Sequence, residues 1–132
     1  MNKAGLLHHV EIYVDNLEAT KTFWGWFLDR LGYVTYQEWD AGISYQKGET
    51  YLVFVQTEEK YLIPKYHRCH SGLNHLAFHA ASRDMVDAIT DELRKRGITI
   101  LYEDRHPYAS GEDAYAVFFE DPMRMKVELC AY

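Results

Sequence analysis

Two histidines occupy matching places in two similar stretches of the sequence, and both are suited to bind a metal. His9 is the third residue of the stretch Leu7–Val14, and His75 is the third residue of Leu73–Ala80. Both stretches alternate in polarity, as a half-buried β-strand does. Imidazole nitrogens are common ligands of first-row divalent metals. Two such side chains brought toward one cavity would therefore favour metal chemistry.

A carboxylate near the end of the sequence completes a possible ligand set. Alternate residues of a strand share a face, so Glu128 faces away from its apolar neighbours Val127 and Leu129. Together, His9, His75 and Glu128 offer two nitrogens and one oxygen. Such a triad with open positions is typical of non-haem iron, and manganese, zinc and nickel stay open as alternatives.

The same alternation places other polar side chains beside the two histidines. Glu11 and Tyr13 share the face of His9, and His79 shares the face of His75. Glu11 could serve as a catalytic base or could simply be a solvated strand residue. The segment 66–70 contains two histidines and a cysteine, but it lies in a linker without a matching partner. We interpret it as a solvated or substrate-facing loop.

The two histidines belong to a repeat that continues through a strand, a helix and a glycine. His9 and His75 are 66 positions apart, and Gly32 and Gly97 are 65 apart, which indicates an internal duplication. The apolar spacing predicts helices over 16–31 and 83–96, begun by Asp15 and Ser82. Strands are predicted at 6–14, 33–39, 43–46 and 51–57 in the first half, and at 73–80, 98–103, 114–120 and 125–131 in the second.

The pattern therefore predicts an α+β fold of two βαβββ modules. They span about 6–57 and 73–131, are joined by the linker 58–72, and form a single domain over 1–132. The second module has a longer loop, 105–113, which contains Tyr108. Loops of this kind often carry binding residues.

Composition narrows the classes of partner and the compartment. The net charge is −6, and no stripe of basic residues suggests nucleic-acid binding. No stretch approaches the roughly 18 consecutive apolar residues of a membrane helix, and the N-terminus lacks a signal-peptide core. The two cysteines have neither zinc nor redox spacing, which fits a reducing cytoplasm.

Three parts of the sequence resemble the vicinal oxygen chelate superfamily, which includes glyoxalase I, extradiol dioxygenases, fosfomycin-resistance proteins and bleomycin-binding proteins. The resemblance covers about residues 6–131. Its most specific parts are His9-Val10-Glu11-Ile12-Tyr13-Val14 with the following Asp15-Asn16-Leu17-Glu18, then Asn74-His75-Leu76-Ala77-Phe78, and finally Phe119-Glu120-Asp121-Pro122 with Lys126-Val127-Glu128-Leu129.

This resemblance implies a cupped, eight-stranded mixed sheet with the helices on its outer face. It also implies one divalent metal ion held by residues on the first and last strands of each module. Carried over by position, the four places are occupied by His9, Phe54, His75 and Glu128. Phenylalanine cannot bind a metal, so the four-ligand pattern of glyoxalase I is incomplete. Three ligands would leave open positions for a bidentate substrate.

The resemblance leaves two classes of function. The first is a metal-dependent enzyme that chelates a small oxygenated substrate on the metal. Lyase, isomerase, transferase and dioxygenase chemistry all use such chelation in this superfamily. Tyr13, Phe54, His79 and Tyr108 would shape its substrate pocket, with Glu11 as the catalytic residue. The second is a metal-free dimer that sequesters an aromatic or cationic small molecule, favoured by the 11 tyrosines and 3 tryptophans. Either protein is expected to be a homodimer.

Overall fold

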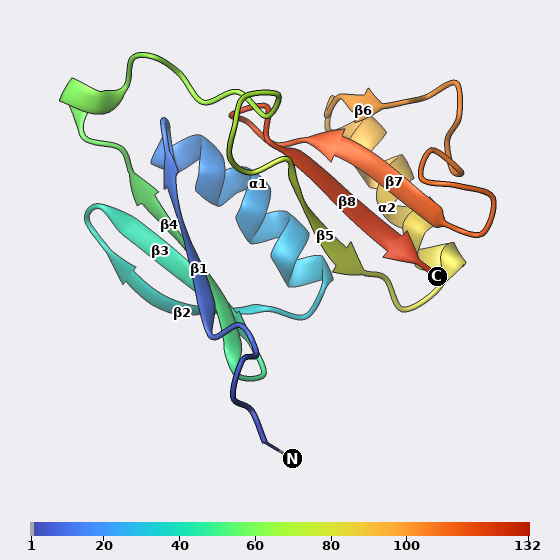
Figure 1. Ribbon diagram of the computed structural model, residues 1–132, viewed down its shortest axis with the longest axis horizontal. Helices are drawn as coiled ribbons and strands as arrows, with labels where there is room; N and C mark the ends of the chain where they lie inside the picture. Colours follow the sequence, from blue (N-terminus) through green and yellow to red (C-terminus); the bar gives the residue numbers. More distant parts are fainter. Residues whose placement is uncertain (1) are drawn as a thin grey trace. The chain divides into compact units, whose positions relative to one another are not determined.

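The computed structural model describes residues 2–132 (Figure 1). Internal contacts divide the chain into two units, one ending at Lys65 and the other beginning at Tyr66. Each unit contains one of the two modules expected from the sequence. Neither of the two α-helices in the described residues is long and apolar enough to cross a lipid bilayer.

The first unit has the order β-α-β-β-β. Its sheet is mixed, with strand order β1-β4-β3-β2, in which β1 pairs with β4 in parallel and the other pairs are antiparallel. The elements are β1 (His9–Val14), α1 (Leu17–Arg30), β2 (Val34–Trp39), β3 (Gly42–Lys47), β4 (Thr50–Gln56) and the short 3-10 helix η1 (Glu59–Tyr61).

The second unit repeats this topology. Its sheet has the order β5-β8-β7-β6, and β5 pairs with β8 in parallel as β1 does with β4. The elements are β5 (His75–His79), α2 (Arg83–Lys95), β6 (Ile100–Leu101), β7 (Tyr115–Glu120) and β8 (Lys126–Ala131). The α+β class and the two βαβββ modules are therefore confirmed.

Within the described residues, the eight strands form two four-stranded sheets, one in each module, where the sequence analysis expected one eight-stranded sheet. The periodicity of a sequence predicts how many strands a module contains. Hydrogen bonding between the edge strands of two modules has no such signal, because any edge strand carries the same unpaired backbone groups.

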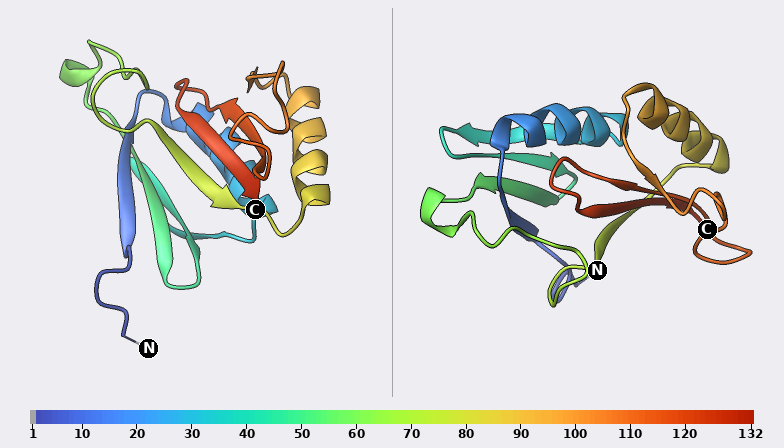
Figure 2. Two further views of the ribbon diagram at one scale, coloured as in Figure 1. Left: turned by 45° about the vertical axis from the view of Figure 1, so that its right-hand side comes forward. Right: turned by 90° about the horizontal axis from the view of Figure 1, so that it is seen from above.

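Each helix packs against one face of its own sheet (Figures 1 and 2). In the first module Trp24, Phe27 and Leu28 of α1 are fully buried, and Phe54 of β4 contacts the Trp24 ring at 5.1 Å between centroids. In the second module Val86, Ile89 and Leu93 of α2 are fully buried, as are Val117, Phe119, Val127 and Leu129 of β7 and β8. These apolar faces leave the opposite face of each sheet for other chemistry.

The N-terminus of α1 differs by one residue from the prediction. Asn16, not Asp15, is the cap: its side-chain oxygen accepts a hydrogen bond from the backbone N–H of Ala19 at 3.0 Å. Gln56 of β4 fixes this turn, since its amide accepts from Leu17 N–H at 2.8 Å and donates to the Asp15 carbonyl at 2.9 Å. The prediction of Ser82 as the cap of α2 is confirmed.

β6 is much shorter than the strand predicted at 98–103. It ends at Leu101 because Tyr102 leaves the extended conformation, with a φ of 58°. The loop that follows returns toward the sheet, and Ala109 packs with Tyr102 on a small cluster formed by Ala116, Phe118 and Cys130. This cluster lies on the face of the second sheet that points away from α2.

Candidate metal centre

His75 and Glu128 form a close pair on the face of the second sheet that points away from α2. In the parallel ladder of β5 and β8, Ala77 lies opposite Glu128, so His75 is one step along the same face. The His75 Nε2 atom lies 3.0 Å from the Glu128 Oε1 atom. Two of the three predicted metal ligands are thus brought together by strand register.

Neighbouring groups orient both side chains of this pair. Asn74 Oδ1 lies 2.7 Å from His75 Nδ1, and because a carbonyl oxygen can only accept, Nδ1 carries the hydrogen. The buried Glu128 carboxylate, 4% exposed, accepts a hydrogen bond from the Tyr132 hydroxyl at 2.5 Å through its other oxygen. This arrangement fits a metal-binding pair, in which outer groups fix the tautomer of the histidine and the carboxylate rotamer.

The electrostatics of the pair call for a cation between its two facing atoms. With Nδ1 already protonated, Nε2 of a neutral His75 presents a lone pair toward an ionised carboxylate oxygen. Two lone pairs 3.0 Å apart are repulsive unless a proton or a metal ion lies between them. With a proton on Nε2 the two residues form an ion pair. A divalent metal, which would be bound by Nε2 and Oε1, fits the same two atoms.

The third predicted ligand, His9, belongs to the first unit. Its ring stacks on Tyr51 at 4.7 Å between centroids, and its Nδ1 lies 2.9 Å from Nδ1 of His8. Among residues 2–132 no three His, Cys, Asp or Glu side chains are grouped as a metal site. That His9 binds the same metal ion as His75 and Glu128 thus stays a prediction.

Phe54 does not occupy the fourth ligand place that the sequence analysis assigned to it. Glu128 lies opposite Ala77, and the corresponding partner in the first module is Val53, which lies opposite Glu11. Phe54 is fully buried and packs on Trp24, on the helix side of the sheet. It therefore cannot line a substrate pocket on the face of His9. The fourth ligand place is therefore occupied by Val53, and valine cannot bind a metal either.

The remaining predicted residues are distributed as follows. Glu11 and Tyr13 are exposed on the face of His9, and His79 is exposed on the face of His75, as alternation predicted. Tyr108 instead packs on the ring of Tyr115 at 5.7 Å. The hydroxyl of Tyr115 reaches Asp87 of α2, so Tyr108 is anchored toward the helix side.

Two residues near the pair were missed by the sequence analysis. Tyr132 donates to Glu128, and its hydroxyl lies 3.4 Å from the Ser110 hydroxyl in the loop after β6. Because alternate residues of a strand share a face, the sequence could have indicated that Tyr132 lies on the same face as Glu128. Nothing in the sequence pattern indicated which loop residue would reach it.

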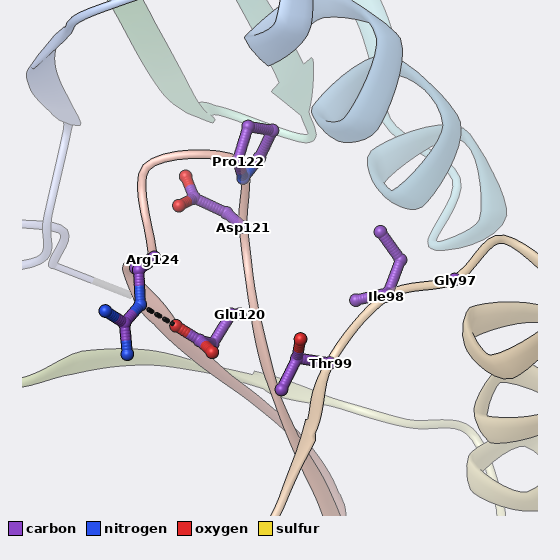
Figure 3. A pocket seen from close by; sticks show the side chains of 7 residues that line it. All are labelled: Gly97, Ile98, Thr99, Glu120, Asp121, Pro122 and Arg124. Carbon is purple, nitrogen blue, oxygen red and sulfur yellow. Dashed lines mark hydrogen bonds and ion pairs between the residues drawn. The ribbon is translucent and has the colours of Figure 1, made fainter.

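Two surface pockets are lined by residues other than this pair. One, of about 400 Å³, is lined by Gly97–Thr99, Glu120–Pro122 and Arg124 (Figure 3). The other, of about 410 Å³, is lined by Lys3, Leu6, Leu7, His8, Glu49 and Thr50. In the first, Arg124 is ion-paired with Glu120 at 2.8 Å, and Arg68 from the linker joins the same carboxylate oxygen at 2.9 Å.

The histidines of the linker segment 66–70 fold onto each other. The rings of His67 and His70 stack at 4.9 Å, and His67 Nδ1 accepts from the backbone N–H of Cys69 at 3.0 Å. Arg68 ties the segment to Glu120. The sequence analysis interprets this segment as a solvated or substrate-facing loop. The contacts show that it is a loop whose Arg68 is bound to the second sheet.

Comparison with known proteins identifies the family. Residues 6–129 match the model of the Glyoxalase/Bleomycin resistance protein/Dioxygenase superfamily. The chain belongs to this superfamily. Its relatives include the uncharacterized protein YqjT of Bacillus subtilis, which is 58% identical over 125 residues, covering 95% of this chain and 98% of YqjT.

Solved structures of the superfamily share the fold. A crystal structure of a candidate glyoxalase from Bacillus halodurans is 59% identical, with a TM-score of 0.97 over 98% of each chain. The lactoylglutathione lyase of Agrobacterium tumefaciens, at 19% identity, has a TM-score of 0.67 over 98% of this chain and 96% of its own. At 19% identity, the similarity to the lactoylglutathione lyase shows a shared fold alone. Superfamily members typically bind a metal ion, which agrees with the chemistry of the His75–Glu128 pair.

Proposed function

We propose that this chain is a metal-dependent enzyme that binds one divalent cation through His9, His75 and Glu128 and chelates a small oxygenated substrate on it. The observation that carries the proposal is the oriented His75–Glu128 pair, with 3.0 Å between Nε2 and Oε1. Iron, manganese, zinc and nickel all suit two nitrogens and one carboxylate oxygen. Membership of a superfamily that typically binds a metal supports the same reading.

The roles of the residues follow from their positions. A bound divalent ion would supply Lewis acidity to two adjacent oxygens of the substrate. Asn74 holds the His75 ring, and Tyr132 holds the Glu128 carboxylate. Glu11 is exposed on the face of His9 and is suited to accept a proton from a substrate carbon or hydroxyl. Tyr13 and His79 would contact the substrate. Lyase, isomerase, transferase and dioxygenase chemistry are all compatible with this set.

The proposal includes a homodimer in the cytoplasm. Superfamily members are commonly dimers that bind small molecules. The two cysteines, Cys69 and Cys130, are both free thiols, which is consistent with a reducing compartment.

One observation favours a second candidate, a metal-free binding protein for an aromatic or cationic small molecule. Tyr51 is the centre of an aromatic group on the face of His9: His9 stacks on it, and His8 and Tyr36 contact it at 5.4 and 5.2 Å. Aromatic rings of this kind can stack on an aromatic ligand or hold a cation.

Activity assays on metal-reconstituted protein test the enzyme proposal. Protein stripped with a chelator is loaded separately with Fe²⁺, Mn²⁺, Zn²⁺ or Ni²⁺. It is then assayed for turnover of the methylglyoxal–glutathione hemithioacetal and for oxygen uptake with a panel of catechols. The variants are His75→Ala and Glu128→Gln, with the linker variant His70→Ala as the matched control.

The enzyme proposal expects activity that requires metal, and a loss of at least roughly 100-fold in the ligand variants but not in His70→Ala. The absence of one ligand from the four-ligand set predicts that the hemithioacetal is not the preferred substrate. If no substrate is turned over and metal-free protein binds an aromatic ligand tightly, the protein is the metal-free binding protein instead of the enzyme.

A further inference from the structure

The geometry points to an oxyanion-binding site next to the His75–Glu128 pair, formed by Lys126, Arg105 and the hydroxyl of Tyr102. The site would bind a carboxylate or phosphate group. Combined with the proposed function, on which this part rests, it identifies the substrate as a small acid. Its anionic group would lie beside the oxygens that the metal chelates.

Lys126 is placed on the same face as His75 by strand register. The two residues are Cα partners in the parallel ladder of β5 and β8, so their side chains leave the sheet on the same side. The half-buried Lys126 ammonium donates to the Tyr102 hydroxyl at 3.1 Å and lies 5.5 Å from the Tyr102 ring centroid and 6.0 Å from that of Phe118.

Arg105 brings a second cation to the same tyrosine. Its guanidinium carbon lies 5.0 Å from the Tyr102 ring centroid. The chain has 20 acidic residues and only 14 basic ones. Even so, among the described residues no carboxylate lies within ion-pair distance of either Lys126 or Arg105. Two like charges are thus gathered at one ring without a counter-ion from residues 2–132.

The hydrogen-bonding capacity of this group indicates an acceptor ligand. The Tyr102 oxygen accepts from Lys126, which leaves its own hydrogen to donate elsewhere. The Tyr102 ring attracts the Arg105 guanidinium, and its hydroxyl holds the Lys126 ammonium, but neither contact neutralises a charge. A carboxylate or phosphate would accept from the ammonium, the guanidinium and the phenol together, and charge-assisted bonds of this kind are the stronger ones.

The backbone at Tyr102 supports a site at this position. Its φ of 58° lies in the left-handed region, which is costly for an aromatic residue and tends to occur where function requires it. This conformation ends β6 and turns the chain so that Arg105 N–H bonds to the Tyr102 carbonyl at 3.0 Å. The tight turn holds the two residues together.

Phe118 links the oxyanion site to the proposed metal site. Its buried ring contacts His75 at 5.9 Å on one side and Tyr102 at 5.4 Å on the other. A substrate that spans both sites would lie over this ring. The expected substrate therefore has an apolar portion between its chelating oxygens and its anionic group.

Anion titrations of chelator-treated protein test the proposal without any contribution from a metal. Inorganic phosphate and acetate are titrated separately at constant ionic strength, and binding is followed by NMR shifts of the Lys and Arg side chains. The parent protein is expected to bind one of the two saturably, and the stronger probe distinguishes a phosphate site from a carboxylate site. Lys126→Met and Arg105→Gln should each weaken binding roughly tenfold, which corresponds to about 1.4 kcal/mol.

Two further variants make the test specific. Tyr102→Phe keeps the ring and the Arg105 contact but removes the hydroxyl and the hydrogen bond that it accepts from Lys126. It should weaken binding less than Lys126→Met does, because both cationic side chains remain. Lys95→Met, at an exposed site on α2, should bind like the parent. Circular dichroism checks that each variant is folded. The proposal is overturned if neither anion binds saturably, or if folded Lys126→Met and Arg105→Gln bind as the parent does.

His75→Ala separates this proposal from the proposed function. Metal-free His75→Ala should bind the anion as the parent does, because His75 contributes none of the three donors. If anion binding fails while metal binding requires His75, the enzyme proposal stands without the acid substrate. If anion binding holds while no metal binds, the oxyanion site stands and the metal-dependent function fails.

Discussion

The Nε2 atom of His75 lies 3.0 Å from the Oε1 atom of Glu128, although the two residues are 53 positions apart in the sequence and lie on different strands. Asn74 occupies the other nitrogen of the imidazole, and Tyr132 occupies the other oxygen of the carboxylate. Each member of the pair is therefore held by a neighbour and directs one atom toward the other. Either a proton on Nε2 or a metal ion between the two atoms would stabilise such an arrangement.

Replacement of Phe54 tests its assignment to the core. Phe54→Ala should lower the free energy of unfolding by about 3–5 kcal/mol, because it removes a fully buried ring that packs on Trp24. Urea denaturation measures the change. Tyr13→Ala is the control, since Tyr13 is 62% exposed and should cost far less. Similar losses in the two variants would contradict the assignment of Phe54 to the helix side.

Two substitutions of Arg124 can separate the effect of backbone strain on stability from the effect of its ion pair. Arg124 has a φ of 63° and pairs with Glu120 at 2.8 Å. Arg124→Ala and Arg124→Gly both lose the ion pair, but glycine alone relieves the left-handed backbone. We expect Arg124→Gly to be more stable than Arg124→Ala by roughly 1 kcal/mol. Thermal unfolding of the two variants gives the comparison, and equal stability would show that the strain at this residue is negligible.

Glu120 should contribute to the pH dependence of stability. Burial raises the pKa of this carboxyl, but hydrogen bonds and charges from Arg124 and Arg68 outweigh it, so the pKa lies below the usual value of 4.5. A depressed folded-state pKa stabilises the protein above the unfolded-state value, and this contribution is lost as the pH falls through the folded-state pKa. Glu120→Gln should therefore be less stable than the parent near neutral pH, by roughly 1 kcal/mol.

The difference between parent and Glu120→Gln should shrink as the pH falls from 5 toward 3, in urea denaturation at closely spaced pH values. Glu112→Gln, at an exposed loop position, provides the control and should follow the parent throughout. A gap that stays constant down to pH 3 would mean that the charge of Glu120 is not what stabilises the protein.

The alternation of polar and apolar residues predicts which face of a sheet each side chain occupies, but only in strands that have one buried face. His9, Glu11 and Tyr13 alternate with apolar residues, and the structure exposes them on one face as expected. β4 offers no such alternation, because Leu52, Val53 and Phe54 are consecutive, apolar and buried. A slip of one residue reverses the face of every side chain. The assignment of Phe54 failed for this reason.

The local chemistry of turns and loops was less predictable. Asp15 and Asn16 are both good cap residues, and the choice depends on Gln56, which holds the Asp15 carbonyl from another strand. Likewise, the loop after β6 was expected to contribute Tyr108 to the substrate pocket. In the structure, Ser110 of this loop contacts Tyr132, and Arg105 contacts Tyr102. Such long-range partners leave no periodic signal in a sequence.

The metal content of protein purified without chelators and without nickel resin tests the central claim most directly. Elemental analysis of the parent should find about one divalent ion per chain, whether His9 comes from the same subunit or a second one. Folded His75→Ala should retain about a tenth of that content or less, and His70→Ala should match the parent. A parent protein without bound metal that also fails to bind added Fe²⁺, Mn²⁺, Zn²⁺ or Ni²⁺, or a His75→Ala variant that binds as much metal as the parent, would contradict the account.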